Sequence, residues 1–180
     1  MKTHPSLPCW LVGAAFIAVG SVAIAAPSTG KVNPADVDTI AHIIRADLDS
    51  VSGPTGPKNK IRQQTLYTPT ASFVSLSNSG GQLKIVPMTF EQYLGPTSSE
   101  ASYEREIGRR TERYGNLASV RSIAEERGLP GGPVTARYIN YYHLFFDGKR
   151  WWIAGNIWQT ESPNTPIPSA WVGKWEEVTR

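Results

Sequence analysis

The side chains best suited to acid–base chemistry in this sequence are two neighbours, Tyr142 and His143. A tyrosine hydroxyl can donate a hydrogen bond to a carbonyl oxygen, and an imidazole exchanges its proton near neutral pH. Together they could serve a lyase or an isomerase as acid and base. Neither residue belongs to a catalytic motif, so they are candidates, and no group of residues in the chain identifies a reaction.

The other histidine outside the N-terminal segment predicts no chemistry. His42 follows Asp38 by four residues, the spacing of neighbours on one helix face, and we interpret the two as an exposed ion pair. Two separate histidines, without cysteines nearby and without the H-E-x-x-H spacing, predict no metal site. Because the glycine spacing of a dinucleotide-binding loop and the G-x-S-x-G nucleophile motif are both missing from the sequence, we also expect no cofactor.

The distribution of charge argues against nucleic acid as a partner. The 180 residues carry a formal net charge of +3, and no block of Lys and Arg reaches the density of a nucleic-acid-binding surface. The arginines between residues 105 and 113 alternate with glutamates, which is typical of a solvated face of mixed sign. We therefore expect no nucleic-acid partner.

The N-terminus predicts export. Lys2 precedes a small and apolar run over residues 9–26 that ends in Ala-Ile-Ala-Ala, the pattern of a signal peptide over residues 1–25. An uncleaved anchor is the alternative. Cleavage would remove Cys9, the single cysteine, and would leave neither a disulfide nor a thiol nucleophile. We expect a periplasmic or secreted bacterial protein, free of the membrane after cleavage, with a disordered leader over residues 26–32.

The candidate acid and base lie in the best-defined element of the sequence, a hairpin with strands at Ala136–Phe146 and Trp151–Glu161. Aromatic and β-branched residues fill both strands, and Asp147-Gly148 favours a tight turn between them. Successive residues of a strand face opposite sides. One face of the first strand therefore holds Tyr138, Asn140, Tyr142, Leu144 and Phe146, and His143 lies on the other. An even-length turn would add Trp151, Ile153 and Ile157 to the first face, whereas a bulge would add Trp152, Ala154, Asn156 and Trp158.

The elements before the hairpin predict helices followed by strands. Ile40, Ile44 and Leu48 recur at helical spacing, which predicts a helix over Pro34–Val51 with Asn33 as its N-cap. Further elements are expected as a short helix over 58–66, a hairpin over 71–88, a brief helix after Thr89, and strands over 102–113 and 117–125. This order predicts one α+β domain over residues 33–171, with a curved antiparallel sheet wrapped around N-terminal helices, and a C-terminal tail over 172–180.

Four segments carry a resemblance to a known family: Glu104–Ile107, Arg113–Ala118, Gly148–Ile153 and Pro166–Pro168. With the order of elements, they look like a secreted bacterial subfamily, without an assigned activity, of the nuclear transport factor 2-like (SnoaL-like) superfamily. The resemblance covers about residues 34–171. It implies a cone-shaped α+β fold, a pocket inside the cone and frequent homodimers. It does not imply one chemistry, since the members include steroid isomerases, dehydratases, polyketide cyclases and non-catalytic binders.

The steroid isomerase mechanism is not expected despite the resemblance. The resemblance places Ser75 near the position of the isomerase base and Tyr142 near the position of the second acid. A serine hydroxyl cannot accept a proton as a carboxylate does. The dehydratase and cyclase mechanisms need a His–Asp pair inside the cone, and His143 has no aspartate partner that the sequence identifies.

The function we favour is the binding of a small apolar or aromatic molecule inside the cone, rather than catalysis. The expected lining residues are Asn140, Tyr142, Leu144, Phe146, Arg121, Asn156 and Trp158. Two alternatives stay open: a lyase or isomerase that uses Tyr142 and His143, and a structural or interaction subunit whose cone is filled by side chains. Because both faces of the hairpin are apolar, the face outside the cone needs cover, either from a second copy in a homodimer or from the proline-rich C-terminal segment with Trp171 and Trp175.

Overall fold

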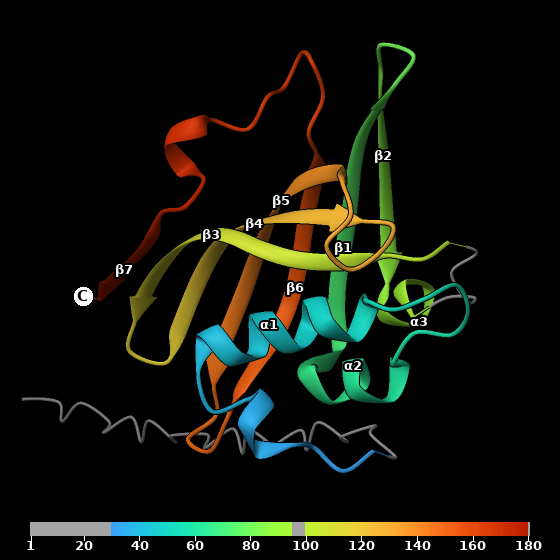
Figure 1. Ribbon diagram of the computed structural model, residues 1–180. Coiled ribbons are helices and arrows are strands. Elements are labelled where there is room, and N and C mark those ends of the chain that lie inside the picture. The colour runs from blue at the N-terminus through green and yellow to red at the C-terminus, as the bar shows by residue number, and fades with distance from the viewer. Residues whose placement is uncertain (1–29, 95–99, 180) are drawn as a thin grey trace, which may run out of the picture.

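The computed structural model describes residues 30–94 and 100–179 (Figure 1). The predicted signal peptide lies outside the described residues, as does most of the expected leader. The end of that leader is ordered by packing, since Val32 lies against the hydrophobic core. Within the described ranges, no helix is both long and apolar enough to span a membrane.

The N-terminal helix differs from the prediction because it has two caps. Asn33 caps only a 3-10 turn, η1 (Pro34–Asp36), where its side chain accepts a hydrogen bond from a backbone amide. The helix proper, α1 (Ile40–Val51), begins after Thr39, whose hydroxyl accepts the amide proton of the third helical residue at 3.1 Å. A threonine in this place satisfies an amide at the helix start, so the expected continuous helix over residues 34–51 is divided in two.

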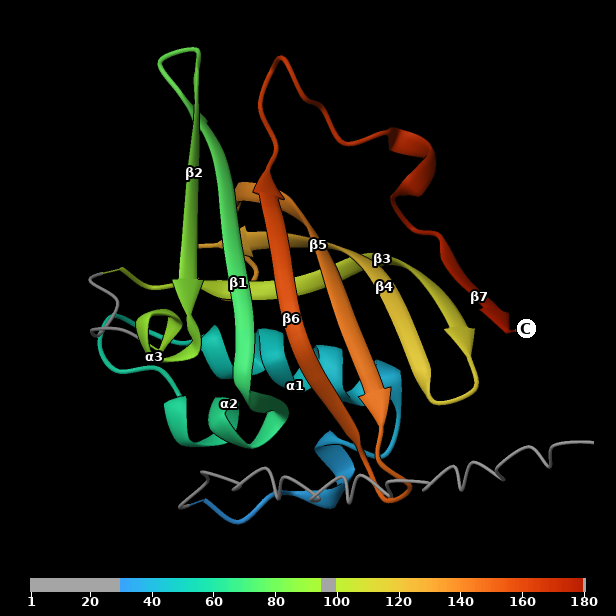
Figure 2. The same ribbon diagram turned by 180° about the vertical axis from the view of Figure 1, so that it is seen from behind.

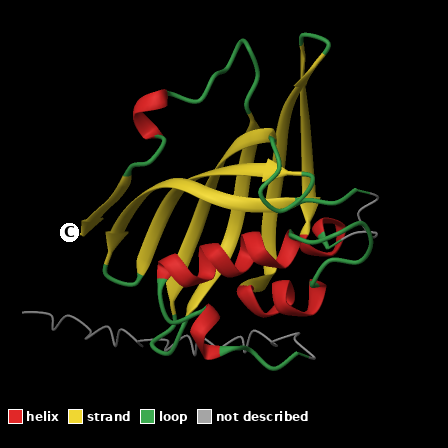
Figure 3. Ribbon diagram, viewed as in Figure 1, coloured by secondary structure: helices red, strands yellow, loops and turns green. Residues whose placement is uncertain are grey.

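A second helix, α2 (Lys60–Leu66), lies beside α1, and both face the same side of the sheet (Figures 1 and 3). An ion pair joins this layer, because the Arg62 guanidinium donates to both carboxylate oxygens of Asp36 at 2.8 and 2.9 Å. The buried side chains of α1, including Ile43 and Ile44, pack onto the concave face of the sheet. The core therefore lies between α1 and that face.

One seven-stranded sheet forms the second layer, in the order β2-β1-β6-β5-β4-β3-β7. The strands are β1 (Tyr67–Ser79), β2 (Gln82–Thr89), β3 (Tyr103–Tyr114), β4 (Leu117–Arg127), β5 (Val134–Phe146), β6 (Trp151–Thr160) and β7 (Trp175–Thr179). Two short helices complete the described fold: α3 (Phe90–Tyr93), the brief helix expected after Thr89, which begins with a capping box, and the 3-10 turn η2 (Ser169–Trp171). The predicted α+β class, with a curved sheet and N-terminal helices, is confirmed.

Two details of the sheet correct the prediction. The sheet is mixed rather than antiparallel, since β1 runs parallel to β6 and β7 runs parallel to β3. The residues expected as a C-terminal tail contribute β7, which pairs with the edge strand β3. Backbone groups at a sheet edge need partners, and the end of the chain supplies them here.

A β-bulge in the hairpin decides which side chains enter the cone. Leu144 of β5 lies opposite Ile153 of β6, but His143 lies opposite Gly155, so Ala154 is an extra residue. An extra residue shifts the alternation by one position. Near the turn, Ile153 therefore faces inward with Leu144, whereas beyond the bulge Asn156 and Trp158 share the inner face with Tyr142 and Asn140. The hairpin thus uses both of the predicted patterns, one on each side of the bulge.

The convex face of the sheet is only partly covered. Figure 2 shows it without any of the described helices over β1, β5 and β6. At the β4 side, the Arg121 guanidinium lies 3.7 Å from the centre of the Trp171 ring, and Ile123 is buried. The C-terminal segment therefore covers this part of the face, whereas Tyr141 and Ile157 remain 45% and 41% exposed.

Candidate functional site

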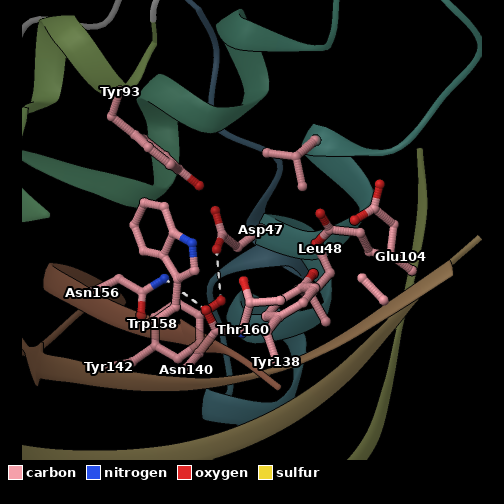
Figure 4. Close-up of a pocket in the computed structure, with 13 residues that line it drawn as sticks. Asp47, Leu48, Tyr93, Glu104, Tyr138, Asn140, Tyr142, Asn156, Trp158 and Thr160 are labelled. Atoms are coloured by element: carbon pink, nitrogen blue, oxygen red, sulfur yellow. Dashed lines mark hydrogen bonds between the residues drawn. The ribbon is translucent and has the colours of Figure 1, made fainter. Parts of the chain in front are cut away.

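A cavity of about 240 Å³ lies between α1 and the concave face of the sheet (Figure 4). Its lining residues come from α1, α3 and the strands β3 to β6. The helix α1 supplies Asp47 and Leu48, and β5 supplies Tyr138, Asn140 and Tyr142, the inward-facing residues of alternate positions. The site is therefore built by the hairpin that the sequence predicted and by one helix laid across it.

Asp47 is the central charged group of this cavity. It is 2% exposed, and its Oδ2 atom accepts a hydrogen bond of 2.8 Å from the Tyr142 hydroxyl. Asp47 comes four residues after Ile43 and three after Ile44, so it lies on the same face of α1 as these two residues, both of which are fully buried. The apolar stripe that anchors α1 to the sheet thus carries a carboxyl group into the interior.

Burial raises the pKa of Asp47 to about 6, because the charged form loses its hydration. The Tyr142 hydroxyl limits this rise by donating its hydrogen bond to the carboxylate. The side chains of Tyr67 and Gln63 lie close by and act in the same direction, although neither completes a hydrogen bond to Asp47 in the structure. At neutral pH Asp47 is therefore mostly ionised, in an apolar setting, with its Oδ1 atom unpaired among the described residues.

A second carboxyl group, that of Glu104 on β3, lines the same cavity. Burial raises its pKa to about 8, and the negative charges of Asp47 and Glu126 add to the rise. The neighbouring Tyr138 hydroxyl and, from further away, Lys58 partly offset it. Glu104 is consequently protonated at neutral pH while Asp47 is ionised, so the cavity holds one carboxylic acid and one carboxylate.

An amide pair forms the floor of the cavity. The Asn156 side-chain Nδ2 donates a hydrogen bond of 3.0 Å to the Asn140 Oδ1, and both residues are 3% exposed. The remaining amide atoms, Asn140 Nδ2 and Asn156 Oδ1, have no partner among the described residues, and neither has the Tyr138 hydroxyl. Buried polar atoms are normally paired, so these atoms are available to a guest in the cavity.

Aromatic rings form one wall. Tyr93 stacks on Phe73 with ring centres 4.1 Å apart, and it meets Trp158 edge-on at 5.7 Å. Figure 4 shows Tyr93 and Trp158 on the same side of the cavity as Asn156. The wall offers flat apolar surface beside the polar floor, the combination that binds small ring-containing molecules.

The structure brings together four of the seven residues expected to line a pocket: Asn140, Tyr142, Asn156 and Trp158. Leu144 and Phe146 face inward on the same strand but pack into the core nearer the turn, where Phe146 contacts Trp151. Arg121 faces the convex side beneath Trp171 and is not part of the cavity.

The candidate acid and base do not converge. Tyr142 is buried and lies in the cavity, whereas His143 is exposed on the convex face, because consecutive residues of β5 point to opposite sides. Ser75, which the resemblance places near the position of the isomerase base, does not line the cavity either. The exposed pairing of His42 with Asp38, expected from their spacing, is confirmed at 2.7 Å.

Sequence reasoning missed Asp47, Glu104 and Tyr138. A signal for Asp47 was present, since it interrupts the apolar stripe of α1 in register with Ile40 and Ile44. Glu104 stands among alternating charges at the start of β3, a pattern typical of a solvated face, so the sequence does not predict its place in the cavity. Across residues 30–94 and 100–179, no group of three or more His, Cys, Asp or Glu side chains is placed to hold a metal ion.

Comparison with known proteins adds a likeness of fold. No family model matches the chain, and no curated protein matches it. A nuclear transport factor 2-like protein of unknown function from Methylobacillus flagellatus aligns with a TM-score of 0.44 and 12% identity over 68% of this chain and 90% of its own. A similar protein from Shewanella baltica gives 0.42 and 15% over 69% and 98%.

A suggested ketosteroid isomerase from Parabacteroides distasonis aligns with a TM-score of 0.48 and 8% identity, over 72% of this chain and 98% of its own. Likenesses at these TM-scores and identities carry no argument about activity. The described elements themselves, N-terminal helices packed against a curved, open seven-stranded mixed sheet, form an α+β fold.

Proposed function

We propose that this chain is an exported protein that binds a small aromatic molecule in the cavity between α1 and the sheet. The observation that carries the proposal is a cavity with an aromatic wall and a polar floor whose buried atoms lack partners. Export rests on the sequence of residues 1–25, which precede the described part of the chain.

The size of the cavity defines the size of the guest. A volume of about 240 Å³ exceeds the roughly 150 Å³ of an engineered cavity that binds benzene. It falls below the roughly 300 Å³ at which sites for drug-sized ligands begin. A single substituted ring fits this range.

The cavity also favours binding over the two alternatives from the sequence. A subunit with a cone filled by side chains would leave no such space, and its buried polar atoms would be paired with one another. The acid–base pair of Tyr142 and His143 would need both side chains in one place, but β5 points them to opposite faces of the sheet.

Acid–base catalysis remains a second candidate function through a different pair. Asp47, with a pKa of about 6, is suited to accept a proton at neutral pH, and Glu104, with a pKa of about 8, is suited to donate one. Conversion of a bound ligand that disappears in Asp47→Asn, while binding of the ligand persists, would support this function.

Binding is tested with a panel of single-ring compounds that share a phenyl ring: benzyl alcohol, benzylamine and benzoate. We expect at least one to raise the melting temperature by several degrees, since a ligand at a hundredfold excess over its Kd stabilises a protein by about 2.7 kcal/mol. The fluorescence of Trp158, which lies in the wall, should change in parallel.

A variant that fills the cavity provides the control. Ala136 lines the cavity, so Ala136→Phe should occupy the space of the ligand and abolish the shift. Ser119 is exposed on the convex side of the neighbouring strand, and Ser119→Phe should leave the shift intact. If no compound stabilises the wild type, or if Ala136→Phe binds as well as the wild type, the proposed function fails.

A further inference from the structure

We propose that the cavity selects an organic cation, a small arylalkyl amine whose protonated nitrogen binds the Asp47 carboxylate and whose ring packs against Tyr93 and Trp158. This inference rests on the proposed function and names the chemical class of its ligand. Three features of the site carry it: the charge of the lining, an unpaired carboxylate oxygen and the aromatic wall.

The lining of the cavity carries acids and no base. Asp47, Glu104 and Glu126 all line it, whereas the described lining residues include no Lys, Arg or His. Two basic side chains, Lys58 and Lys60, line the neighbouring hollow but not the cavity, and the Lys58 ammonium donates to two backbone oxygens at 2.7 and 2.9 Å. An anionic ligand would therefore enter a negative site without a counter-charge, which costs free energy in a medium of low dielectric constant.

The unpaired carboxylate oxygen gives the cation a specific place. Asp47 is 2% exposed, its Oδ2 atom is occupied by Tyr142, and its Oδ1 atom has no partner among the described residues. A buried carboxylate is stabilised strongly by an opposite charge that also donates a hydrogen bond. An alkylammonium group supplies both and has two further protons for other oxygen atoms of the lining, which include the unpaired hydroxyl of Tyr138.

The aromatic wall suits a cation as well as an apolar ring. A positive charge near the face of Trp or Tyr is attracted by the electron-rich face of the ring. Tyr93 and Trp158 lie next to each other on one side of the cavity (Figure 4). A benzyl-type ligand can thus place its ring against this wall and its ammonium group toward Asp47.

A second hollow suggests how the ligand enters. This hollow has a volume of about 290 Å³ and shares Val51, Tyr93, Glu104 and Glu126 with the cavity. Glu104 and Glu126 are opposite one another on β3 and β4 at this junction. Lys58 and Lys60 also line this hollow, so it carries charges of both signs, and the preference for a cation comes from the cavity lining and Asp47.

Protons should leave the site when a cation binds. The groups that face Asp47 are Tyr142 on β5, Tyr67 at the start of β1, Tyr93 on α3, Gln63 on α2 and Glu104 on β3. The tyrosine pKa values are raised well above their usual value, so these hydroxyls stay neutral. A bound ammonium favours the charged form of nearby carboxyls, and near pH 7 Glu104 is the group that still holds a proton to release.

Titration calorimetry of the full chain with benzylamine, benzyl alcohol and benzoate tests the inference at pH 7. We expect benzylamine to bind at least tenfold more tightly than benzyl alcohol, and benzoate not to bind. Repeating the benzylamine titration in buffers of different ionisation enthalpy should reveal the released proton, since the apparent binding enthalpy then depends on the buffer.

Two carboxylate variants locate the effect. Asp47→Asn should bring the affinities for benzylamine and benzyl alcohol within about twofold of each other. Asp49→Asn removes a 49% exposed carboxylate from the same helix and should retain the tenfold preference. Circular dichroism establishes that both variants are folded.

The outcomes separate this inference from the proposed function. If benzyl alcohol binds as tightly as benzylamine in the wild type, the cation inference is wrong while the aromatic binding site stands. If Asp47→Asn keeps the preference, the ammonium is not held by Asp47, and the inference as stated is overturned. If none of the three compounds binds, both proposals fail together.

Discussion

Asp47 is buried in the interior, although a charged carboxylate loses favourable hydration there. The helix α1 cannot turn it outward, because Ile43 and Ile44 on the same stripe are fully buried against the sheet. Its single hydrogen bond, from Tyr142, compensates only part of the lost hydration. A site that costs stability in this way is typical of positions kept for binding or catalysis, where function and stability compete.

This cost predicts a specific pH dependence of stability. The pKa of Asp47 is about 6 in the folded protein and about 3.9 in an unfolded chain. The folded state therefore binds the Asp47 proton more tightly, so the contribution of Asp47 to stability is fully present below about pH 4 and is lost as the pH rises to about 6. A shift of about two pKa units corresponds to about 2–3 kcal/mol.

Urea unfolding of the wild type and of Asp47→Asn between pH 4 and pH 7.5 measures this contribution. Asparagine can still accept the Tyr142 hydrogen bond but carries no charge. We expect the free energy of unfolding of Asp47→Asn, measured relative to that of the wild type, to rise by about 2–3 kcal/mol as the pH increases from 4 to 7.5. If the stability difference stays constant over this range, the pKa of Asp47 is not raised in the folded protein. Asp47 would then lack the raised pKa on which its role as a proton acceptor depends.

Among the elements, the β5–β6 hairpin positions most of the site, and its bulge decides which residues enter. A bulge adds one residue to one strand, so every residue beyond it points to the opposite side of the sheet from the side that simple alternation would give. The strand β1 packs closely beside the bulge, where Ser72 pairs with Gly155. A Cβ atom at Gly155 would lie 2.9 Å from the backbone oxygen of Ser72, which is too close. A glycine at this position lets β1 approach β6 closely enough to pair with it.

Substituting this glycine should therefore disturb both the sheet and the site. We expect Gly155→Ala to lower the free energy of unfolding by about 1–3 kcal/mol, the usual cost of overpacking. It should also weaken binding of the benzyl ligands, because Asn156 and Trp158 directly follow the bulge. Chemical unfolding and the ligand-induced shift in melting temperature measure the two effects.

Gly128 offers a matched control for this substitution. A Cβ atom at Gly128 would meet no other atom within 4 Å, so Gly128→Ala should change neither stability nor binding appreciably. If Gly155→Ala is as well tolerated as Gly128→Ala, the close approach of β1 does not fix the bulge.

The same elements show what the sequence could and could not predict. Alternation and turn residues predicted the hairpins and the strands, because these signals are local. The two facing patterns of β6 could not be told apart from alternation alone, because the bulge at Ala154 changes the facing within the strand. The position of Asp47 in the apolar stripe is a sequence signal, but its hydrogen-bond partner, Tyr142, comes from the distant strand β5.

On the scale of the whole molecule, the convex face of the sheet is divided into a covered and an open part. Ile123 on β4 is buried, and both its side chain and the backbone oxygen of Trp171 lie against Gly108. The C-terminal segment thus provides cover there, one of the two forms of cover expected from the sequence. The open part includes Tyr141 and Ile157, which are directly opposite each other on β5 and β6.

We propose that a second copy of the chain covers this open part, as the apolar faces of the hairpin led us to expect. Exposed apolar patches on sheets commonly mark interfaces between subunits, and symmetric dimers are the commonest assemblies. Gel filtration with light scattering should give the mass of a dimer for the wild type at micromolar concentration. Ile157→Glu would place a charge in the centre of the interface and should yield a monomer.

Ile61 provides the control for this experiment, because it is 62% exposed on α2, which lies on the other side of the sheet (Figure 1). Ile61→Glu makes the same substitution outside the proposed interface and should remain dimeric. The ligand-binding cavity faces the opposite side of the sheet, so benzylamine affinity should be the same in the monomeric and dimeric variants. A monomer mass for the wild type would end the dimer proposal, and loss of the dimer in both variants would place the interface elsewhere.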